Sequence, residues 1–465
     1  MPRTSLRAAG YFFSLITLAL PLVYGCEDST SAPDADGVTV TPDGGDANVP
    51  STCAPATGEG TKHTAPTVNE TWTAAGSPHV LESNYSIPTG VTLTLEPCAV
   101  VQLKGAIGIS VSGKLVAQGA ADKPIRFERG DAAMAWTSLE SEAGAEIRLS
   151  YTTLEGGGNP NGGPPTQFGA LDIRGNQEAA PQPLLFVDHV TIKGSESLGI
   201  WLREGGAFAP GSQDLTITGG ASFPMLIWGR ASGTVPTGTY TGNASDEIIL
   251  PASGGLDDMK EDTVLRDRGV PYRVGGPTGG KSLTVGAVGA VPLLTIEPGV
   301  TLRFDKDVRL TVDANTTAEP ASGALIAEGT ADKPVTFTSA SATPAAGDWV
   351  GIVFEGTPDP RSKIAFAKIS YAGAGSGISS FDCASPANPG FSNDGAIIIA
   401  GGKPASAFVT NTTIENSLGD GIVRGWTGDL VDLLATNTFA GVARCNQTYP
   451  KPVVGACPSP APCPK

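Results

Sequence analysis

The sequence predicts an all-β fold in which the chain coils into a solenoid built from two similar halves. The 465-residue chain has 61 glycines, 38 prolines and only 16% charged residues, and short runs of Val, Ile, Leu and Thr alternate with turn residues. Apolar residues rarely recur at the helical spacing of about 3.6 residues. Several phrases of the first half also return, in the same order, in the second half. Such repeats are typical of stacked architectures.

The repeated phrases define pairs of matching strands. The clearest pair is "LTLEPCAVV" and "LTIEPGVTL", and a second is "KLVAQGAADKPIRF" and "ALIAEGTADKPVTF". The matching stretches are residues 93–101 with 294–302, 114–127 with 324–337, and 186–200 with 408–422. The distance between matches grows along the chain, so the second half carries inserted loops between retained strands.

The N-terminus predicts an export signal followed by a lipid anchor. The apolar run at residues 11–22 is too short for a membrane helix of about 20 residues and has the length of a signal-peptide core. The following "VYGC" resembles a bacterial lipobox, which implies cleavage before Cys26 and lipid attachment to its sulfur. An ordinary secretory signal with a chance cysteine is the alternative. We expect an extracytoplasmic protein, anchored to the bacterial envelope at the outer membrane or cell surface.

The charge of the chain restricts its partners. Its formal net charge is −16, and such an acidic chain is repelled by nucleic acid and by anionic lipid headgroups. We therefore expect no nucleic acid partner. The membrane contact is expected to be made through the lipid anchor alone.

Six cysteines follow Cys26, and an even number in an exported chain predicts disulfides. They are Cys53, Cys98, Cys383, Cys445, Cys457 and Cys463. Cys53 and Cys98 are the only two in the first half, and Cys98 stands in the turn position that Gly299 fills in the second half. We expect these two to form a bridge that holds the N-terminal extension onto the first strands. The pairing of the other four stays open.

Segments such as "LVAQG", "PIRF" and "HVTIKG" lack tight Asn-Gly hairpins, so the chain is expected to coil rather than zigzag. With "LTIEPGV", "KPVTF" and "WVGI" at residues 294–354, it resembles the right-handed parallel β-helix (pectin-lyase-like) proteins among bacterial exported lipoproteins. The resemblance implies a right-handed parallel β-helix solenoid with disulfide-stapled ends. The expected organisation is 1–25 signal peptide, 26–50 lipidated cysteine and disordered acidic tether, 51–71 N-terminal cap region, 72–268 first half, 269–445 second half, and 446–465 Pro/Cys-rich tail.

One stretch has the spacing of a phosphate-binding loop. "GGPTGGKS" at residues 275–282 matches the pattern, with Lys281 and Ser282 in the required places. A phosphate loop must open a helix, whereas the residues that follow have a strand pattern. We therefore expect a Gly-rich loop before a strand, with no nucleotide and no other cofactor.

Asp188 and His189 lie in "VDHVTI", which faintly resembles the Asp-His segment of β-helical pectate lyases, where acidic residues hold calcium. The matching segment of the second half has Thr410 and Asn411 instead. This difference fits either a site in one half only or ordinary turn residues, and turn chemistry is the interpretation we favour. The chain has only three histidines, so we expect no metal site.

Aromatic residues give the better indication of binding. If Ile200 and Leu202 of "GIWLRE" point into the coil, Trp201 and Arg203 point outward, where an indole beside a guanidinium suits a sugar ring or an acidic glycan. The candidates for glycan contact are Trp201, Arg203, Trp228 and Trp426. Trp136 and Trp349 occupy matching places in the two halves and are expected to be structural.

Three functions are compatible with these patterns. The leading hypothesis is a non-catalytic, lipid-anchored surface protein whose β-helix presents a face for glycan or matrix binding. The second is a polysaccharide lyase or hydrolase, by analogy of fold alone, because no catalytic residues can be identified. The third is a structural spacer. A group of carboxylates with a Lys or Arg in one lateral groove favours the enzyme, and a flat face with an exposed Trp favours binding.

Overall fold

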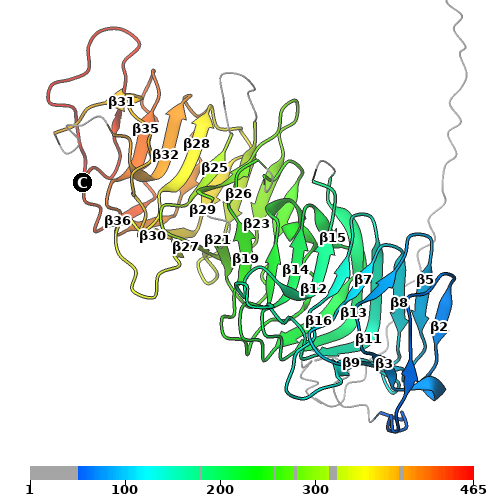
Figure 1. Ribbon diagram of the computed structural model, residues 1–465. Coiled ribbons are helices and arrows are strands. Elements are labelled where there is room, and N and C mark those ends of the chain that lie inside the picture. Colours follow the sequence, from blue (N-terminus) through cyan, green and yellow to red (C-terminus); the bar gives the residue numbers. More distant parts are fainter. Residues whose placement is uncertain (1–50, 178–179, 256–257, 277–279, 314–321, 387–391) are drawn as a thin grey trace, which may run out of the picture. The chain divides into compact units, whose positions relative to one another are not determined.

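The computed structural model describes residues 51–177, 180–255, 258–276, 280–313, 322–386 and 392–465. Within these residues the chain is a stack of short, mostly parallel strands, so the predicted parallel β-helix is confirmed. Figure 1 shows the strands side by side, from blue N-terminal rungs to red C-terminal rungs. The described helical segments are the two short 3-10 turns η1 (Ala74–Gly76) and η2 (Gly229–Thr234). None of the described helices could span a bilayer.

Two large sheets run along the stack. The 12-stranded sheet contains β1 (Thr61–Lys62), β2 (Glu70–Trp72), β3 (His79–Leu81), β5 (Thr92–Leu95), β6 (Val100–Leu103), β8 (Lys114–Gln118), β9 (Ile125–Arg129), β11 (Glu146–Glu155), β13 (Gln182–Lys193), β15 (Gly206–Phe208), β16 (Gln213–Thr218) and β18 (Gly238–Thr239). The 13-stranded sheet contains β4 (Tyr85–Ile87), β7 (Ile109–Val111), β10 (Leu139–Ser141), β12 (Gly169–Arg174), β14 (Leu198–Arg203), β17 (Met225–Ile227), β19 (Ile248–Pro251), β21 (Tyr272–Gly275), β24 (Thr301–Phe304), β27 (Val335–Ser339), β30 (Ala367–Ser370), β34 (Thr413–Glu415) and β36 (Thr438–Ala440).

Three smaller sheets complete the second half. One five-stranded sheet contains β20 (Thr263–Leu265), β23 (Leu293–Ile296), β26 (Ala324–Glu328), β29 (Lys363–Ala365) and β33 (Val409–Thr410). The other contains β22 (Ser282–Val285), β25 (Arg309–Val312), β28 (Gly351–Gly356), β32 (Gly395–Gly401) and β35 (Asp420–Gly425). β31 (Asp382–Cys383) and β37 (Tyr449–Pro450) form an antiparallel pair.

The two sequence halves form two structural copies. The first copy comprises strands β2 to β14 and the second comprises β20 to β35, and each rung uses up to three strands. The repeated phrases occupy matching strands, with β5 and β6 in the first copy corresponding to β23 and β24 in the second. The predicted internal repeat is therefore present in three dimensions.

Where the two copies join, each strand position of the rung moves to a different sheet of the β-helix. In the first copy the third strand of each rung, such as β14, belongs to the 13-stranded sheet, and its counterpart β35 belongs to a five-stranded sheet. The 13-stranded sheet continues through β19 and β21 into the second strands of the second copy. Equivalent strands of the two copies thus belong to different sheets.

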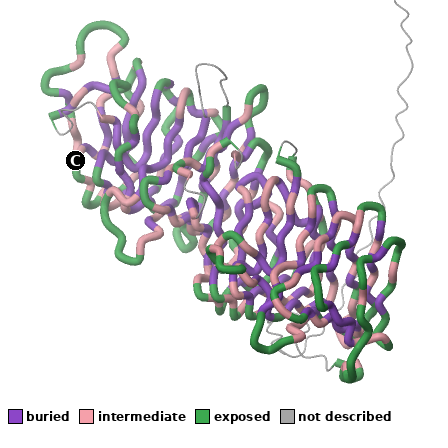
Figure 2. Tube along the Cα trace, viewed as in Figure 1, coloured by how far each residue is buried: buried purple, intermediate pink, exposed green. Residues whose placement is uncertain are grey.

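The core runs along the inside of the coil. Side chains that point inward are fully buried, including Leu115, Phe127, Leu302 and Phe337, whereas their neighbours along each strand are partly exposed. Figure 2 shows this as buried segments repeated along successive strands. This alternation is what a half-buried strand requires, and each rung buries its apolar side chains against its neighbours.

Disulfides lie at both ends of the stack. The predicted bridge between Cys53 and Cys98 is present, and Cys98 has a φ of 69°, close to the 90° of Gly299 in the matching turn. Cys98 therefore occupies the left-handed turn position inferred from the repeat. The remaining bridges join Cys383 to Cys457 and Cys445 to Cys463. Cys26, the expected lipidation site, lies outside the described residues.

Candidate ligand-binding cleft

Three outward positions of the first copy form a ladder across neighbouring strands of the 13-stranded sheet. Glu140 on β10 is paired in register with Asp172 on β12, which is paired with Trp201 on β14. Ile200 and Leu202, on either side of Trp201, are fully buried. The predicted outward direction of Trp201 and Arg203 is therefore confirmed.

Arg203 connects this ladder electrostatically. Its Nη2 lies 2.9 Å from Glu140 Oε1, and its Nε lies 2.9 Å from Asp172 Oδ1. Its Nη1 is 3.5 Å from Glu204 Oε1, and its guanidinium carbon lies 4.9 Å from the centroid of the Trp201 ring. The guanidinium is thus neutralised by three carboxylates, so it is not a free cation for an acidic ligand.

Asp172 is the most perturbed group of the ladder. It is only 7% exposed, and burial raises the pKa of its carboxyl to about 6, although the ion pair with Arg203 acts in the opposite direction. Glu140 raises this pKa further by like-charge repulsion. A carboxyl held in this range exchanges its proton at mildly acidic pH.

A polar cleft of about 340 Å³ opens over the ladder. Its lining consists of Asn84, Ala106, Thr137, Ser138, Glu140, Asn161, Gln167, Phe168, Gly169, Asp172, Trp201 and Arg203. Amide and hydroxyl groups can both donate and accept hydrogen bonds, and the aromatic faces offer apolar contact. This combination suits a ligand with many hydroxyl groups and an apolar ring face, such as a sugar.

An aromatic surface continues the cleft along the stack. Trp201, Phe223 and Trp228 are partly buried and pack on the outward-facing Leu226 and Ile249 of the next two strands. Trp228 is therefore a partly exposed aromatic residue, as expected. Trp426 is not, because it is only 1% exposed and its Nε1 donates to the carbonyl oxygen of Asp429. The expectation that Trp426 contacts glycan was wrong.

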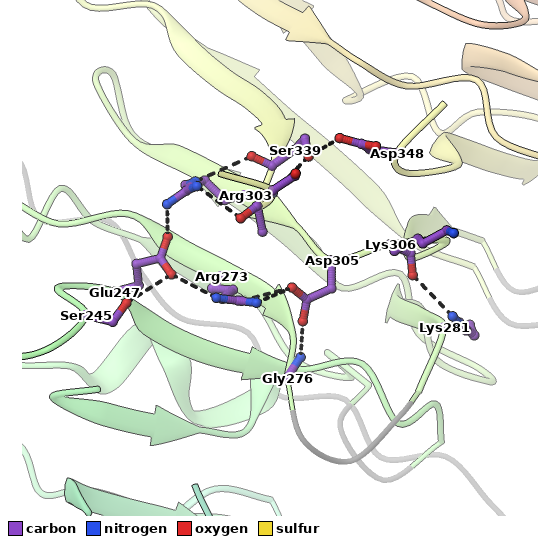
Figure 3. A network of polar contacts seen from close by, with 12 residues as sticks. Ser245, Glu247, Arg273, Gly276, Lys281, Arg303, Asp305, Lys306, Ser339 and Asp348 are labelled. Carbon is purple, nitrogen blue, oxygen red and sulfur yellow. Dashed lines mark hydrogen bonds and ion pairs between the residues drawn. The ribbon is translucent and has the colours of Figure 1, made fainter. Parts of the chain in front are cut away.

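Beyond the aromatic surface, the outward ladder carries two arginines. Arg273 and Arg303 pair in register on β21 and β24, and both form ion pairs with the buried Glu247. Arg273 Nη2 also lies 2.7 Å from Asp305 Oδ1, as Figure 3 shows. Arg303 additionally donates to the carbonyl oxygen of Ala340 at 3.1 Å. The residue types did not reveal this network, because residues that bond to one another in it lie up to 56 positions apart in the sequence.

The second copy fills the ladder differently. Counted from the matching residues Trp136 and Trp349, Val353 takes the position of Glu140. Val353 pairs in register with Ile398, and Ile398 pairs with Val423. All three are fully buried, in a cluster with Val350, Ala374 and Ala400. The β-helix therefore accepts an apolar ladder at the positions where the first copy has Glu140, Asp172 and Trp201.

The other residues singled out in the sequence, Trp136, Trp349 and Lys281, lie at positions that indicate a structural role. Trp136 and Trp349 are buried, and each donates from Nε1 to a carbonyl oxygen of the following rung, as expected of structural residues. Lys281 precedes strand β22, so the helix of a phosphate loop is missing at this position. Residues 277–279 of that stretch lie outside the described residues.

Asp188 and His189 lie at a bend of β13. His189 has a φ of 53° and Asn411 of the second copy has a φ of 49°, which supports the interpretation of this segment as a turn. The structure also brings Asp214 of the next rung to the His189 ring, at 3.5 Å from Nε2. Sequence alone gave no signal for Asp214.

Residues 271–376 match the family model described as a pectate-lyase like beta helix domain. The chain carries a β-helix domain of the pectate-lyase-like kind. No curated protein and no solved structure matches the chain at a significant level. The matched residues belong to the second copy, whereas the cleft belongs to β10, β12 and β14 of the first. The similarity therefore supports the fold and does not extend to the cleft.

Proposed function

We propose that this protein is a lipid-anchored envelope protein whose β-helix binds glycan in the cleft over Glu140, Asp172 and Trp201. One observation carries the proposal: the same ladder in the second copy consists of Val353, Ile398 and Val423. Burying Asp172 against Glu140 is unfavourable unless both are paired, and the fold does not need either carboxylate. A ladder that is polar under the first copy's cleft and apolar at the matching positions of the second copy is best explained by a ligand.

The charge of the cleft defines the class of glycan. Its charged lining comprises two carboxylates and one guanidinium, which are already paired with one another. A uronic acid would meet repulsion from Glu140 and Asp172 without a free cation to compensate. We therefore propose a neutral glycan or one that carries amino sugars, in place of the acidic glycan that the exposed arginine suggested.

Binding can be tested with the full chain and short oligosaccharides of the three charge classes. Neutral hexasaccharides and glucosamine oligomers are expected to bind, and galacturonic acid oligomers are not. Trp201→Ala should weaken binding about tenfold, which corresponds to about 1.4 kcal/mol, because it removes the indole face on which a sugar ring can stack. Val423→Ala, at the matching position of the second copy, is the control and should leave affinity unchanged. Binding confined to galacturonic acid oligomers would contradict the proposal.

The anchor is part of the proposal and has its own test. Cys26 follows a signal-like segment, and Cys26→Ser should release the protein from the membrane fraction without changing the fold of residues 51–465. Retention of the variant on membranes would remove the support for lipidation.

A glycoside hydrolase is the second candidate, and the raised pKa of Asp172 favours it. A carboxyl with a pKa of about 6 beside a second carboxyl group can act as a general acid at mildly acidic pH. Glycan bound by the wild type would then be shortened over time, and Asp172→Asn and Glu140→Gln would each abolish cleavage. Stable, uncleaved oligosaccharide in the presence of saturating protein at pH 5–6 would exclude this candidate.

A further inference from the structure

A bend on three successive rungs of the 12-stranded sheet places titratable side chains together. Tyr151, His189 and Asp214 all have positive φ, at 44°, 53° and 49°. In the second copy the matching bend carries Phe366 and Asn411, both with a φ of 49°. A neutral asparagine therefore adopts the positive φ that the bend requires, at the position where the first copy has histidine. The bend itself does not require an imidazole between two carboxylates.

The imidazole of His189 is held in one orientation. Its Nδ1 donates a hydrogen bond to Asp188 Oδ1 at 2.7 Å, and its ring stacks on Tyr151 with centroids 4.5 Å apart and planes 12° from parallel. Gln213 Nε2 donates to the same Asp188 oxygen at 3.1 Å. These contacts leave His189 Nε2 facing Asp214 Oδ2. A histidine ligand of a metal ion is usually fixed in this manner, by a carboxylate on its other nitrogen.

The spacing fits metal ligands better than a hydrogen bond. His189 Nε2 and Asp214 Oδ2 are 3.5 Å apart, beyond the range of about 2.7–3.2 Å for an N–H···O hydrogen bond. Two ligands on one tetrahedral zinc ion, with bonds of about 2.0–2.1 Å, lie about 3.3 Å apart. One atom each of Asp188, His189 and Asp214 lies within 4.8 Å of the other two. Their side chains are 26%, 24% and 45% exposed, so water can complete the coordination.

We propose that His189 Nε2 and Asp214 Oδ2 bind one divalent transition-metal ion of the zinc class, while Asp188 holds the imidazole through its Nδ1 and water completes the coordination. The nitrogen ligand selects this class, because imidazole suits Zn²⁺, Ni²⁺ and Cu²⁺, whereas Ca²⁺ takes six to eight oxygen ligands. The site lies on β13 and β16 of the 12-stranded sheet, and the glycan cleft lies on the 13-stranded sheet. It goes beyond the proposed glycan function and can be tested separately from it.

The test uses the full chain, stripped with a chelator and then dialysed against ZnCl₂ or CoCl₂. We expect one zinc ion per chain and visible Co²⁺ absorption bands, with no displacement by millimolar Ca²⁺. His189→Asn copies Asn411 and should fold, and both it and Asp214→Asn should weaken zinc binding at least tenfold and remove the Co²⁺ bands. Asn411→Ala, at the matching bend, and His63→Ala, at a distant histidine, are controls that should bind as the wild type does. A wild type without bound zinc, or unchanged affinity in either His189→Asn or Asp214→Asn, would overturn the proposal.

Discussion

The third strands of the two copies have the same register and opposite chemistry. In the first copy the outward ladder is Glu140, Asp172 and Trp201, with Arg203 beside it. In the second copy Val353, Ile398 and Val423 take the same places, and Gly425 stands where Arg203 does. Comparing the two copies therefore shows which side chains the β-helix requires. Both copies have apolar side chains at the inward positions of each rung, whereas the residues of the outward ladder differ.

The difference also shows how a buried polar ladder is tolerated. Asp172 is 7% exposed and keeps its place because Arg203 pairs with it and with Glu140. The three ladder residues of the second copy are apolar instead, and they pack against Val350 and Ala374 in an apolar cluster. The residues of each ladder suit one another, either as paired charges or as packed apolar side chains. Exchanging a single residue between the copies is therefore expected to lower the free energy of unfolding.

The largest effect is expected from placing a carboxylate in the apolar ladder. Ile398 is fully buried in an apolar cluster, so Ile398→Asp should lower the free energy of unfolding by about 4–5 kcal/mol. Denaturant unfolding and hydrogen exchange of β28, β32 and β35 would measure this loss. Ile398→Val, the size control, should cost only about 1 kcal/mol. An unchanged free energy of unfolding for Ile398→Asp would show that the second copy's ladder tolerates a carboxylate as the first copy's ladder does.

The next largest effect is expected at the turn of Cys98, which forms a disulfide in the first copy and has Gly299 at the matching position of the second. Cys98→Gly restores the residue of the matching turn and removes the bridge to Cys53, which spans 45 residues. The chain-entropy model assigns such a loop about 4 kcal/mol, and in a stacked fold the loss should be confined to neighbouring rungs. Hydrogen exchange of residues 79–127 should accelerate while the second copy stays protected. Equal acceleration in both copies would contradict local stabilisation.

A smaller effect follows from the raised pKa of Asp172. The folded protein holds this proton up to about pH 6, whereas an unfolded Asp releases it near pH 3.8, so the folded state binds more protons in that window. Ionisation of Asp172 should therefore lower the free energy of unfolding by about 2 kcal/mol as the pH rises from about 4 to 6. The difference between the wild type and Asp172→Asn, measured by denaturant unfolding at several pH values, isolates this contribution. A difference that does not vary with pH would contradict the raised pKa.

The smallest effect is expected at the loop that resembles a phosphate-binding loop. The Lys281 side chain is 62% exposed, so Lys281→Ala should change the free energy of unfolding by less than about 0.5 kcal/mol. Thermal unfolding with and without ATP would measure both stability and any nucleotide effect. An increase in the unfolding temperature by ATP that the variant loses would contradict the expectation that the chain binds no nucleotide.

Local patterns were enough to predict the rungs and the N-terminal turn. The repeated phrases marked matching strands, and the exchange of Gly299 for Cys98 marked a turn and a disulfide; the left-handed conformation of that turn comes from the structure. Alternation along β14 gave the direction of Trp201, because side chains of one strand point to opposite faces.

Long-range pairing could not be predicted in the same way. Two partners of Arg203, Asp172 and Glu140, lie 31 and 63 residues before it, and only the register of β10, β12 and β14 brings them together. Trp426 follows β35 and is 1% exposed, and the N–H of Lys451 donates to its carbonyl oxygen. Nothing in the residues around Trp426 indicates that it is buried or that a later segment pairs with it.

The central claim is that the first copy's ladder binds glycan and that the fold does not need it. The most direct measurement transfers the second copy's residues into the first, as Glu140→Val, Asp172→Ile, Trp201→Val and Arg203→Gly together. Removing Arg203 with its partners leaves no unpaired cation, and replacing a buried ion cluster by apolar residues is often neutral for stability. Calorimetric titration with the neutral or amino-sugar hexasaccharide that the wild type binds should show no binding to a variant that unfolds cooperatively, as the wild type does. A folded variant that binds this hexasaccharide with wild-type affinity would contradict the claim.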